Sequence, residues 1–202
     1  MRKIIVGEFV SLDGVVEAPD AWHFPYVNDE MFESMWSGLA EADTMLLGRV
    51  TYESYAGAFA NAPDDDPVAA QMNRPAKVVV SNTLRDLEWQ NSTPLPGDVV
   101  EQVTKLKEEP GGAILTTGSI TLVRTLLRAG LVDELSLLVH PIVVGTGRRL
   151  FEDDGPQVRL EFVDCKVFST GVVHQVYRRA ERRSSRWGAM RPPRSHRTPF
   201  GR

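Results

Sequence analysis

The chain has 202 residues, of which 42% are hydrophobic and 25% are charged, and its formal net charge is −4. These values favour one soluble globular domain with a hydrophobic core, although two small domains are possible. No stretch reaches about 18 consecutive apolar residues, and Glu8 and Asp13 interrupt the apolar N-terminal segment, so we expect neither a membrane span nor a signal peptide.

The first 130 residues alternate between short apolar segments, which predict strands, and segments whose apolar residues have helical spacing. In chain order they predict a strand over 3–10, a turn over 11–14, a loop over 15–27, a helix over 28–40, a strand over 44–48, a helix over 49–59, a polar surface segment over 61–75, a strand over 76–81, a helix over 98–108, a strand over 111–118 and a helix over 119–130. The helix over 28–40 begins behind an Asn28/Asp29 cap, and Gly130 ends the helix over 119–130.

The remainder of the ordered chain predicts strands only, over residues 134–144, 159–168 and 171–179. The last two alternate apolar and polar residues around the turn Ser169-Thr170-Gly171, a pattern typical of an antiparallel hairpin. The βαβα order at the front, with its short apolar strands, is typical of a parallel sheet covered on both faces. Together these patterns predict one α/β domain over residues 1–179, with a mixed, mainly parallel central sheet.

Polar, flexible residues follow three of the predicted parallel strands, at Gly48-Arg49, Ser81-Asn82-Thr83 and Gly118-Ser119. The carboxyl ends of parallel strands lie at the same edge of a sheet, and α/β proteins bind their ligands beyond that edge. The sequence therefore predicts a ligand site where these three strand ends converge.

The segment Gly118-Ser119 has two interpretations that the sequence leaves open. Gly118 can simply make a turn while Ser119 caps the following helix. Alternatively, Gly118 lets a ligand approach closely, and the free N–H groups at the start of the helix bind an anion. The segment carries neither the Walker pattern nor the Gly-x-Gly-x-x-Gly fingerprint.

The other two strand ends favour the anion interpretation. Arg49 supplies a permanent positive charge and Thr51 a hydroxyl at the start of a predicted helix, and both suit a phosphate. Ser81, Asn82 and Thr83 add short hydrogen-bonding side chains beside them. A helix start for a pyrophosphate together with an arginine and hydroxyls for a second phosphate describes a dinucleotide such as NADPH.

Three segments, taken in order, resemble the dihydrofolate-reductase-like superfamily: "MLLGRVTYESY", "KVVVSNTL" and "GGAILTTGSITLVRTLLRAGLVDELSLLVHPIVVGTGRRLF". More closely, they are similar to the stand-alone relatives of the reductase domain of bifunctional riboflavin-biosynthesis deaminase-reductases. The resemblance covers residues 1–178, and "GLVDEL" followed by "HPIVVGTGRRLF" is its most specific part. It implies a three-layer α/β/α fold, NADPH as the hydride donor and a homodimer.

The resemblance also implies a role for each strand end. Arg49 and Thr51, after Gly48, would bind the adenosine phosphate end of NADPH, with Ser81 to Thr83 beside them. The pyrophosphate would lie at the helix start, against Gly118, Ser119, Ile120, Thr121 and Leu122. The turn Ser11 to Gly14 would lie by the nicotinamide and the substrate, and Gly145-Thr146-Gly147 would border the pocket from the other side.

Two departures from the family pattern bear on the substrate. In true dihydrofolate reductases an acid stands two residues after the proline of a Trp-x-aliphatic-Pro motif, whereas Val27 stands two residues after the proline of "WHFP" here. A protonated pterin would lack its usual partner. The predicted first helix begins "NDEMFESM", which is acidic and suits a phosphorylated substrate poorly. The fold and the cofactor are therefore better supported than the substrate.

The candidate proton source for hydride transfer is Asp13, because a carboxyl beside an apolar cofactor face would have a raised pKa. The alternative is that Asp13-Gly14 only closes a turn. The aromatic loop formed by Trp22, His23, Phe24 and Tyr26 either covers a planar substrate or is ordinary packing. The residues predicted to contact the substrate are Leu12, Gly14, Trp22, Asp29, Gly145 and Thr146.

Several other polar residues have structural interpretations. Asp29 is expected to cap a helix rather than act as an acid, His140 to lie in the core, and Asp133-Glu134 to serve a helix-to-strand turn, while His174 could face either way. Cys165, the single cysteine, excludes an internal disulfide, fits a reducing cytoplasm and is expected to be buried and inert. The four histidines are too far apart in sequence for metal-ligand spacing, so no metal site is predicted.

Residues 180–202 are rich in Arg, Pro and Ser and are predicted to form a basic, disordered tail. From Arg178 onward the net charge is +8, whereas residues 1–177 carry −12. A nucleic-acid-binding arm is the alternative, but the acidic body and the absence of interleaved aromatic residues argue against it.

The sequence as a whole predicts an NADPH-dependent reductase of a small planar heterocycle, either a 5-amino-6-(5-phosphoribosylamino)uracil-like or a pterin-like compound. The alternative is a nucleotide-binding module with the same pocket and no catalysis. We expect a homodimer, which the apolar, edge-forming C-terminal strands support, and no membrane partner.

Overall fold

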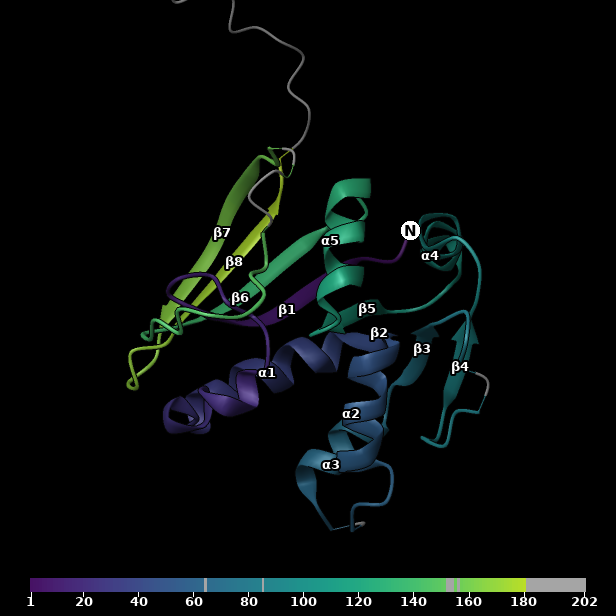
Figure 1. Ribbon diagram of the computed structural model, residues 1–202, viewed down its shortest axis with the longest axis horizontal. Helices are drawn as coiled ribbons and strands as arrows, with labels where there is room; N and C mark the ends of the chain where they lie inside the picture. Colours follow the sequence, from purple (N-terminus) through teal and green to yellow (C-terminus); the bar gives the residue numbers. More distant parts are fainter. Residues whose placement is uncertain (64, 85, 152–154, 156, 181–202) are drawn as a thin grey trace, which may run out of the picture.

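The computed structural model describes residues 1–63, 65–84, 86–151, 155 and 157–180 (Figure 1). Its elements are β1 (Ile4–Ser11), α1 (Asp29–Glu41), β2 (Ala42–Gly48), α2 (Arg49–Phe59), α3 (Pro67–Asn73), β3 (Ala76–Val80), β4 (Ser92–Leu95), α4 (Val99–Glu108), β5 (Ala113–Thr117), α5 (Ile120–Ala129), β6 (Glu134–His140), β7 (Leu160–Val167) and β8 (Val173–Arg179). Two short 3₁₀ turns, Pro19–Ala21 and Phe24–Tyr26, lie in the loop between β1 and α1. The predicted basic tail lies outside the described residues, apart from Ala180.

One eight-stranded sheet runs through the molecule in the order β4-β3-β2-β5-β1-β6-β8-β7. The strands from β4 to β6 pair in parallel, and β8 pairs antiparallel with both β6 and β7. The predicted mixed α/β fold with an antiparallel C-terminal hairpin is confirmed.

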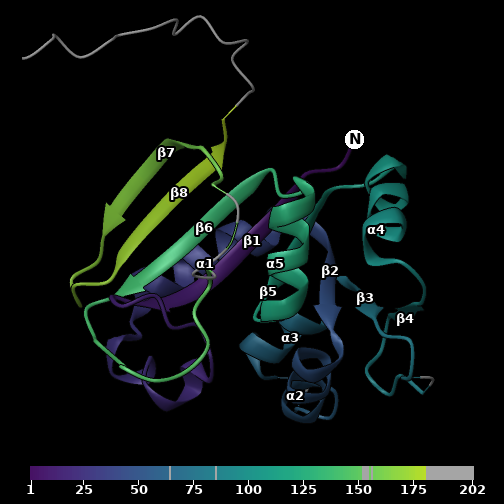
Figure 2. The same cartoon turned by 45° about the horizontal axis from the view of Figure 1, so that its top comes forward.

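Helices cover both faces of this sheet, which gives three layers (Figures 1 and 2). On one face, α4 and α5 pack Val103, Leu106 and Val123 against Val6 and Ile114 of the central strands. On the other face, α1, α2 and α3 cover a second cluster, whose buried members are Leu39, Met45, Leu47, Tyr52, Val79 and Trp89. Right-handed crossovers produce this division, because connections that run in opposite directions along the sheet place their helices on opposite faces.

Two elements were not predicted. The polar segment 61–75 contains α3, which begins at Pro67 behind Asp66, whose carboxylate accepts hydrogen bonds from the amides of Val68 and Ala69. Proline at the first helical position is favourable because its missing N–H would have no partner there. Strand β4 pairs in parallel with β3 and contains Pro94, which is tolerated because β4 lies at the edge of the sheet.

The C-terminal strands require one correction. Cys165 was expected to be buried, but it is exposed, because β7 is the other edge of the sheet and nearly all of its residues are open to solvent.

Helix α5 ends at Gly130 as predicted. Gly130 is in the left-handed conformation (φ 71°), and its amide is hydrogen-bonded to carbonyls of the last turn. None of the helices in the described ranges is long and apolar enough to cross a membrane.

Candidate functional site

Hydrogen bonds connect two of the three predicted strand ends directly. The hydroxyl of Ser119, between β5 and α5, accepts a hydrogen bond from the amide of Gly48 at the end of β2 (2.9 Å). In return, the amide of Ser119 donates to Oγ1 of Thr51 in the first turn of α2 (2.8 Å). We call these two bonds the junction latch. The Ser119 hydroxyl therefore does not cap α5, because it serves the neighbouring strand end instead.

Gly118 lies beside this latch in a backbone conformation that few other residues adopt. Its φ is 58°, and a Cβ atom added there would lie 3.1 Å from both Cγ2 and Oγ1 of Thr51. The predicted tight turn with a positive φ is thus present. The close approach in the described structure is to Thr51.

The start of α5 retains the donors that an anion needs. Val123 makes the first intrahelical hydrogen bond of α5, to the carbonyl of Ser119. The amides of Ile120, Thr121 and Leu122 precede it and have no carbonyl one turn back within the helix. Arg148, from the loop after β6, donates a hydrogen bond to Oγ1 of Thr121 (2.8 Å) and brings a positive charge to this helix start.

The third strand end lies next to the first, because Val80 of β3 pairs with Gly48 of β2. Beyond Val80, the hydroxyl of Ser81 accepts from the amides of Thr83 (3.2 Å) and Leu84 (3.0 Å). The side chain of Asn82 accepts from the amide of Gly97 (2.9 Å). The side chains of Ser81 and Asn82 thus also stabilise the backbone that follows β3.

Arg49 lies at the first position of α2, as predicted, and its guanidinium is bonded to both carboxylate oxygens of Glu53 (3.0 and 2.9 Å). Both side chains are about half exposed, and an ion pair of this kind contributes only a few tenths of a kcal/mol. Such a weak pair leaves the guanidinium available to a more highly charged partner such as a phosphate.

Asp13 does not have the raised pKa that was expected. Its carboxylate accepts hydrogen bonds from the Ser11 hydroxyl (2.7 Å) and from the amides of Val144 (3.0 Å) and Gly145 (2.9 Å). These bonds favour the charged form and lower the pKa of Asp13 to about 2. Asp13 is therefore ionised at neutral pH and joins the turn after β1 to the loop after β6.

This connection brings most of the predicted substrate residues together. Gly14 has a φ of 86° and donates its amide to the carbonyl of Ser11, while the exposed Leu12 donates its amide to the carbonyl of Ile142. Gly145 is held by Asp13, and Thr146 follows it, exposed. The turn at 11–14 and the loop at 144–147 form one wall of the candidate site.

The aromatic loop is mainly packing. Trp22 is buried and lies edge-on to the ring of His140, with ring centroids 5.2 Å apart. His140 is fully buried, as expected, and its Nδ1 lies 2.8 Å from the carbonyl oxygen of Leu138, but its Nε2 has no partner among the described residues. Burial lowers the pKa of His140, which keeps it neutral. Phe24 is the exposed ring of this loop.

The remaining candidates also have definite places. Asn28, and not Asp29, caps α1, since its side-chain oxygen accepts from the amide of Met31 (3.0 Å). Asp29 is the first residue of the helix. His174 faces α1 and lies within hydrogen-bonding distance of the hydroxyls of Ser34 (2.9 Å) and Ser136 (2.7 Å).

Sequence reasoning missed Glu8, although a signal was present. Glu8 lies in β1 with the same parity as Val6 and Val10, which are both in the core, so its side chain had to point inward. It is 4% exposed, and its Oε2 accepts a hydrogen bond from the amide of Gly118 (3.1 Å). Burial raises the pKa of Glu8 well above its usual value.

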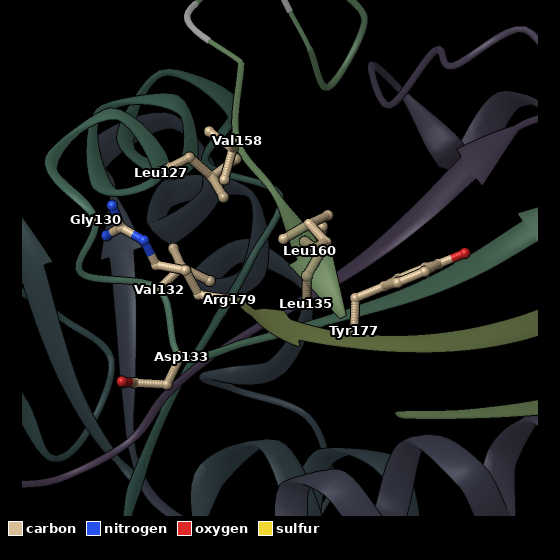
Figure 3. A pocket seen from close by; sticks show the side chains of 9 residues that line it. All are labelled: Leu127, Gly130, Val132, Asp133, Leu135, Val158, Leu160, Tyr177 and Arg179. Carbon is tan, nitrogen blue, oxygen red and sulfur yellow. The ribbon is translucent and has the colours of Figure 1, made fainter. Parts of the chain in front are cut away.

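Figure 3 shows a pocket elsewhere in the fold. It lies between the end of α5, the amino end of β6 and the hairpin β7–β8, and its lining residues are Leu127, Gly130, Val132, Asp133, Leu135, Val158, Leu160, Tyr177 and Arg179. The strand ends described above lie at the opposite end of the parallel strands, so this pocket is separate from the candidate site. No group of three or more His, Cys, Asp or Glu residues within the described part of the chain could hold a metal ion.

Residues 2–174 match the family model of the RibD C-terminal domain. The chain belongs to this family. A curated relative, the uncharacterized protein YyaP of Bacillus subtilis (strain 168), is 31% identical over 180 residues, which cover 87% of this chain and 94% of the relative.

Solved structures support the same fold for this member of the RibD C-terminal domain family. A protein of Shewanella sp. PV-4 described as belonging to riboflavin biosynthesis has a TM-score of 0.72 at 19% identity, with 89% of this chain and 99% of that chain covered. The diaminohydroxyphosphoribosylaminopyrimidine deaminase/5-amino-6-(5-phosphoribosylamino)uracil reductase of Thermotoga maritima has a TM-score of 0.65 at 13% identity. There the match covers 89% of this chain and 57% of the bifunctional protein.

Proposed function

We propose that this protein is an NADPH-dependent reductase of a small planar heterocycle, of the pyrimidine-reductase type within the dihydrofolate-reductase-like superfamily. The observation that carries the proposal is the junction latch, which places the starts of α2 and α5 side by side at the carboxyl edge of the sheet. Membership of the RibD C-terminal domain family supports a reductase of the riboflavin-pathway type.

The order of the strands supports one orientation for the proposed dinucleotide. Strands β3, β2, β5 and β1 are successive neighbours, so a ligand that crosses this edge meets their ends in that order. We assign the adenosine phosphate to Gly48, Arg49, Thr51 and Ser81 to Thr83. The pyrophosphate is assigned to Gly118 to Leu122. The nicotinamide and the substrate then lie toward β1, against Leu12, Gly14, Gly145 and Thr146, with Trp22 and Asp29 as more distant candidates.

The residues present fit such a cofactor. The first amides of α5 and the guanidinium of Arg148 supply donors and positive charge for a pyrophosphate, and Arg49 supplies a guanidinium for a further phosphate. When bound, NADPH would supply the hydride for reduction. The protein residues would orient the cofactor at the latch, with a flat substrate against the wall formed by the turn at 11–14 and the loop at 144–147.

The test is a titration of the purified protein with NADPH and NADH, followed by reduced-nicotinamide fluorescence. We expect micromolar, NADPH-selective binding, and we expect Arg49→Ala to weaken NADPH binding by about 10-fold while NADH binding changes little, because one charge-assisted contact is lost. Glu53→Ala is the matched control, since it removes the same ion pair and leaves the arginine. Unchanged NADPH affinity in Arg49→Ala would show that the phosphate lies elsewhere.

A second candidate is a nucleotide-binding module without catalysis. The observation that favours it is the low pKa of Asp13, which deprives the site of the predicted proton source. Oxidation of NADPH in the presence of pyrimidine or pterin compounds distinguishes the two, because a binding module would hold the cofactor without turnover.

We also propose a homodimer formed through the β7 edge. Phe162, Val163 and Val167 are exposed on this strand, and an open edge with apolar side chains can pair with a second copy. Sedimentation equilibrium is expected to give twice the monomer mass of 22.5 kDa. Val167→Glu should shift the protein toward monomer. Val50→Glu, at an equally exposed valine on α2, should not. A wild-type monomer at high concentration would refute the proposal.

A further inference from the structure

Glu8 occupies a special position in the sheet. Strand β1 pairs with β5 from Ile4 to Gly7, and the last pair joins Gly7 to Thr117. The chain then leaves the sheet at Gly118, so Glu8 is the first residue of β1 that no longer has β5 beside it. This gap between β1 and β2 is the point where an α/β sheet receives its ligand.

The carboxyl of Glu8 is only partly satisfied by the protein. Oε2 accepts the hydrogen bond from Gly118, but Oε1 is fully buried and has no partner among the described residues. The hydroxyl oxygen of Thr116 is also buried and has no hydrogen-bond partner among the described residues. Thr116 pairs with Val6, two residues before Glu8 on the same face, so the two side chains are diagonal neighbours.

Leaving such groups unpaired is unfavourable by about 1–3 kcal/mol each, and native proteins rarely do so. The two atoms therefore indicate a polar group that the protein receives from outside its own chain. Burial raises the pKa of Glu8 well above its usual value and so favours the protonated carboxyl, in which Oε1 can donate a hydrogen bond. Tyr55 of α2 also interacts electrostatically with Glu8, and its own pKa is raised by burial.

We propose that Glu8 is a positioning residue that binds the carboxamide of the reduced nicotinamide ring, with Thr116 as its second contact. This inference rests on the proposed function, which places the pyrophosphate at Gly118 and the nicotinamide toward β1. A primary carboxamide offers one carbonyl acceptor and one NH₂ donor. Oε1–H of Glu8 would donate to the carbonyl oxygen, and Oγ1 of Thr116 would accept from the NH₂ group.

The contact would fix the orientation of the ring. Glu8 is held by the amide of Gly118, which begins the segment assigned to the pyrophosphate, so one residue connects the phosphate part of the site to the ring part. A ring held at its carboxamide cannot rotate about its bond to the ribose, and one face is then presented to the wall that carries Leu12 and Thr146. A carboxylic acid suits this role better than a carboxylate, which could not donate a hydrogen bond.

The experiment compares two probes: NADPH, which carries the carboxamide, and 2′-phospho-ADP-ribose, which has the phosphates and lacks the nicotinamide. Dissociation constants are measured by calorimetry for the wild type, Glu8→Leu and Glu8→Gln. Glu8→Leu is expected to weaken NADPH about 10-fold and to leave 2′-phospho-ADP-ribose within about 2-fold. Of the two hydrogen bonds removed, the one to the carboxamide serves NADPH alone, and the one from the Gly118 amide lies within the protein. Glu8→Gln is expected to restore NADPH binding to within about 3-fold, because its amide can accept from Gly118 and still donate.

Each outcome has a distinct meaning. If Glu8→Leu weakens both probes equally, Glu8 only supports the Gly118 turn, and the inference is overturned while the dinucleotide site stands. If it weakens neither, an internal water satisfies Oε1, and the inference again fails. If the wild type binds neither probe, the proposed function fails together with it. Thermal unfolding of both variants shows whether each is folded. Should Glu8→Leu fail to fold, Thr116→Val provides the same comparison, with a smaller loss for NADPH alone.

Discussion

Replacing Gly118 with alanine is expected to weaken NADPH binding by at least about 10-fold and to lower the free energy of unfolding by about 1–3 kcal/mol. The alanine would have to hold a φ of 58° and place its methyl group 3.1 Å from two side-chain atoms of Thr51. Thr51 must then move, and its Oγ1 is the acceptor for the Ser119 amide. One added methyl group would therefore displace Thr51 by a few tenths of an ångström and weaken the junction latch.

The matched control for this prediction is Gly171→Ala. Gly171 also has a positive φ, 84°, but it lies in the β7–β8 hairpin, and its added Cβ would approach nothing closer than Pro141 at 3.5 Å. This variant should show the backbone strain alone, with lower stability and unchanged NADPH affinity. Urea unfolding and a fluorescence titration measure both quantities. If the two variants lose the same stability and neither loses affinity, the latch does not position the cofactor site.

Removing the carboxylate of Asp133 is expected to have the largest effect on stability. Its side chain accepts a hydrogen bond from the amide of Ile4 (2.8 Å) and pairs with the ammonium of Lys107, which is only 5% exposed. Asp133→Ala leaves a buried charge whose remaining partner is the carbonyl of Leu131, and it also removes the acceptor for Ile4. We expect the free energy of unfolding to fall by about 3 kcal/mol, measured by urea denaturation.

A second substitution separates the two contributions. The double variant Asp133→Ala/Lys107→Met should recover part of the loss, because no unpaired charge remains in the interior. Lys105→Ala is the surface comparison, since the pair of Lys105 with Glu101 is about 60% exposed on both sides, and its removal should change stability by less than about 0.5 kcal/mol. The Asp133 side chain is 43% exposed, so the prediction rests on the burial of Lys107, and equal losses in Asp133→Ala and Lys105→Ala would contradict it.

The parts of the fold that were predictable are those with strong apolar periodicity. Helix α2 begins at Arg49 as predicted, because a short buried strand and a glycine precede it. Strand β4 carries no such signal. It has four residues including a proline, and it exists only because the edge of β3 offers partners to its backbone. Helix α3 also lacks a strong apolar periodicity. It has only seven residues, it begins with Pro67 after three acidic residues, and Pro75 follows it.

The candidate site also has a part that could be predicted from the sequence and a part that could not. Topology was sufficient to bring Gly48, Ser81 and Gly118 to one edge of the sheet. It could not reveal that Ser119 bonds to a residue 71 positions away. The protonation state of Asp13 depends on amides contributed by the distant loop at 144–145, so the expectation of a raised pKa was wrong. The buried carboxyl with a raised pKa is Glu8, whose inward direction the strand pattern already indicated.

The junction latch also affects the thermodynamics of ligand recognition. Ordering loops and side chains around a ligand usually makes the free energy of binding less favourable. Here Ser119 already fixes both helix starts through bonds within the protein, so a phosphate group that arrives between them loses its own freedom without immobilising the chain. In the proposed function, this preorganisation would make the phosphate part of a dinucleotide a strong common anchor. Ligands that share the phosphate part must then be distinguished at the wall formed by the turn at 11–14 and the loop at 144–147, which Asp13 joins. There the remainder of each ligand would lie.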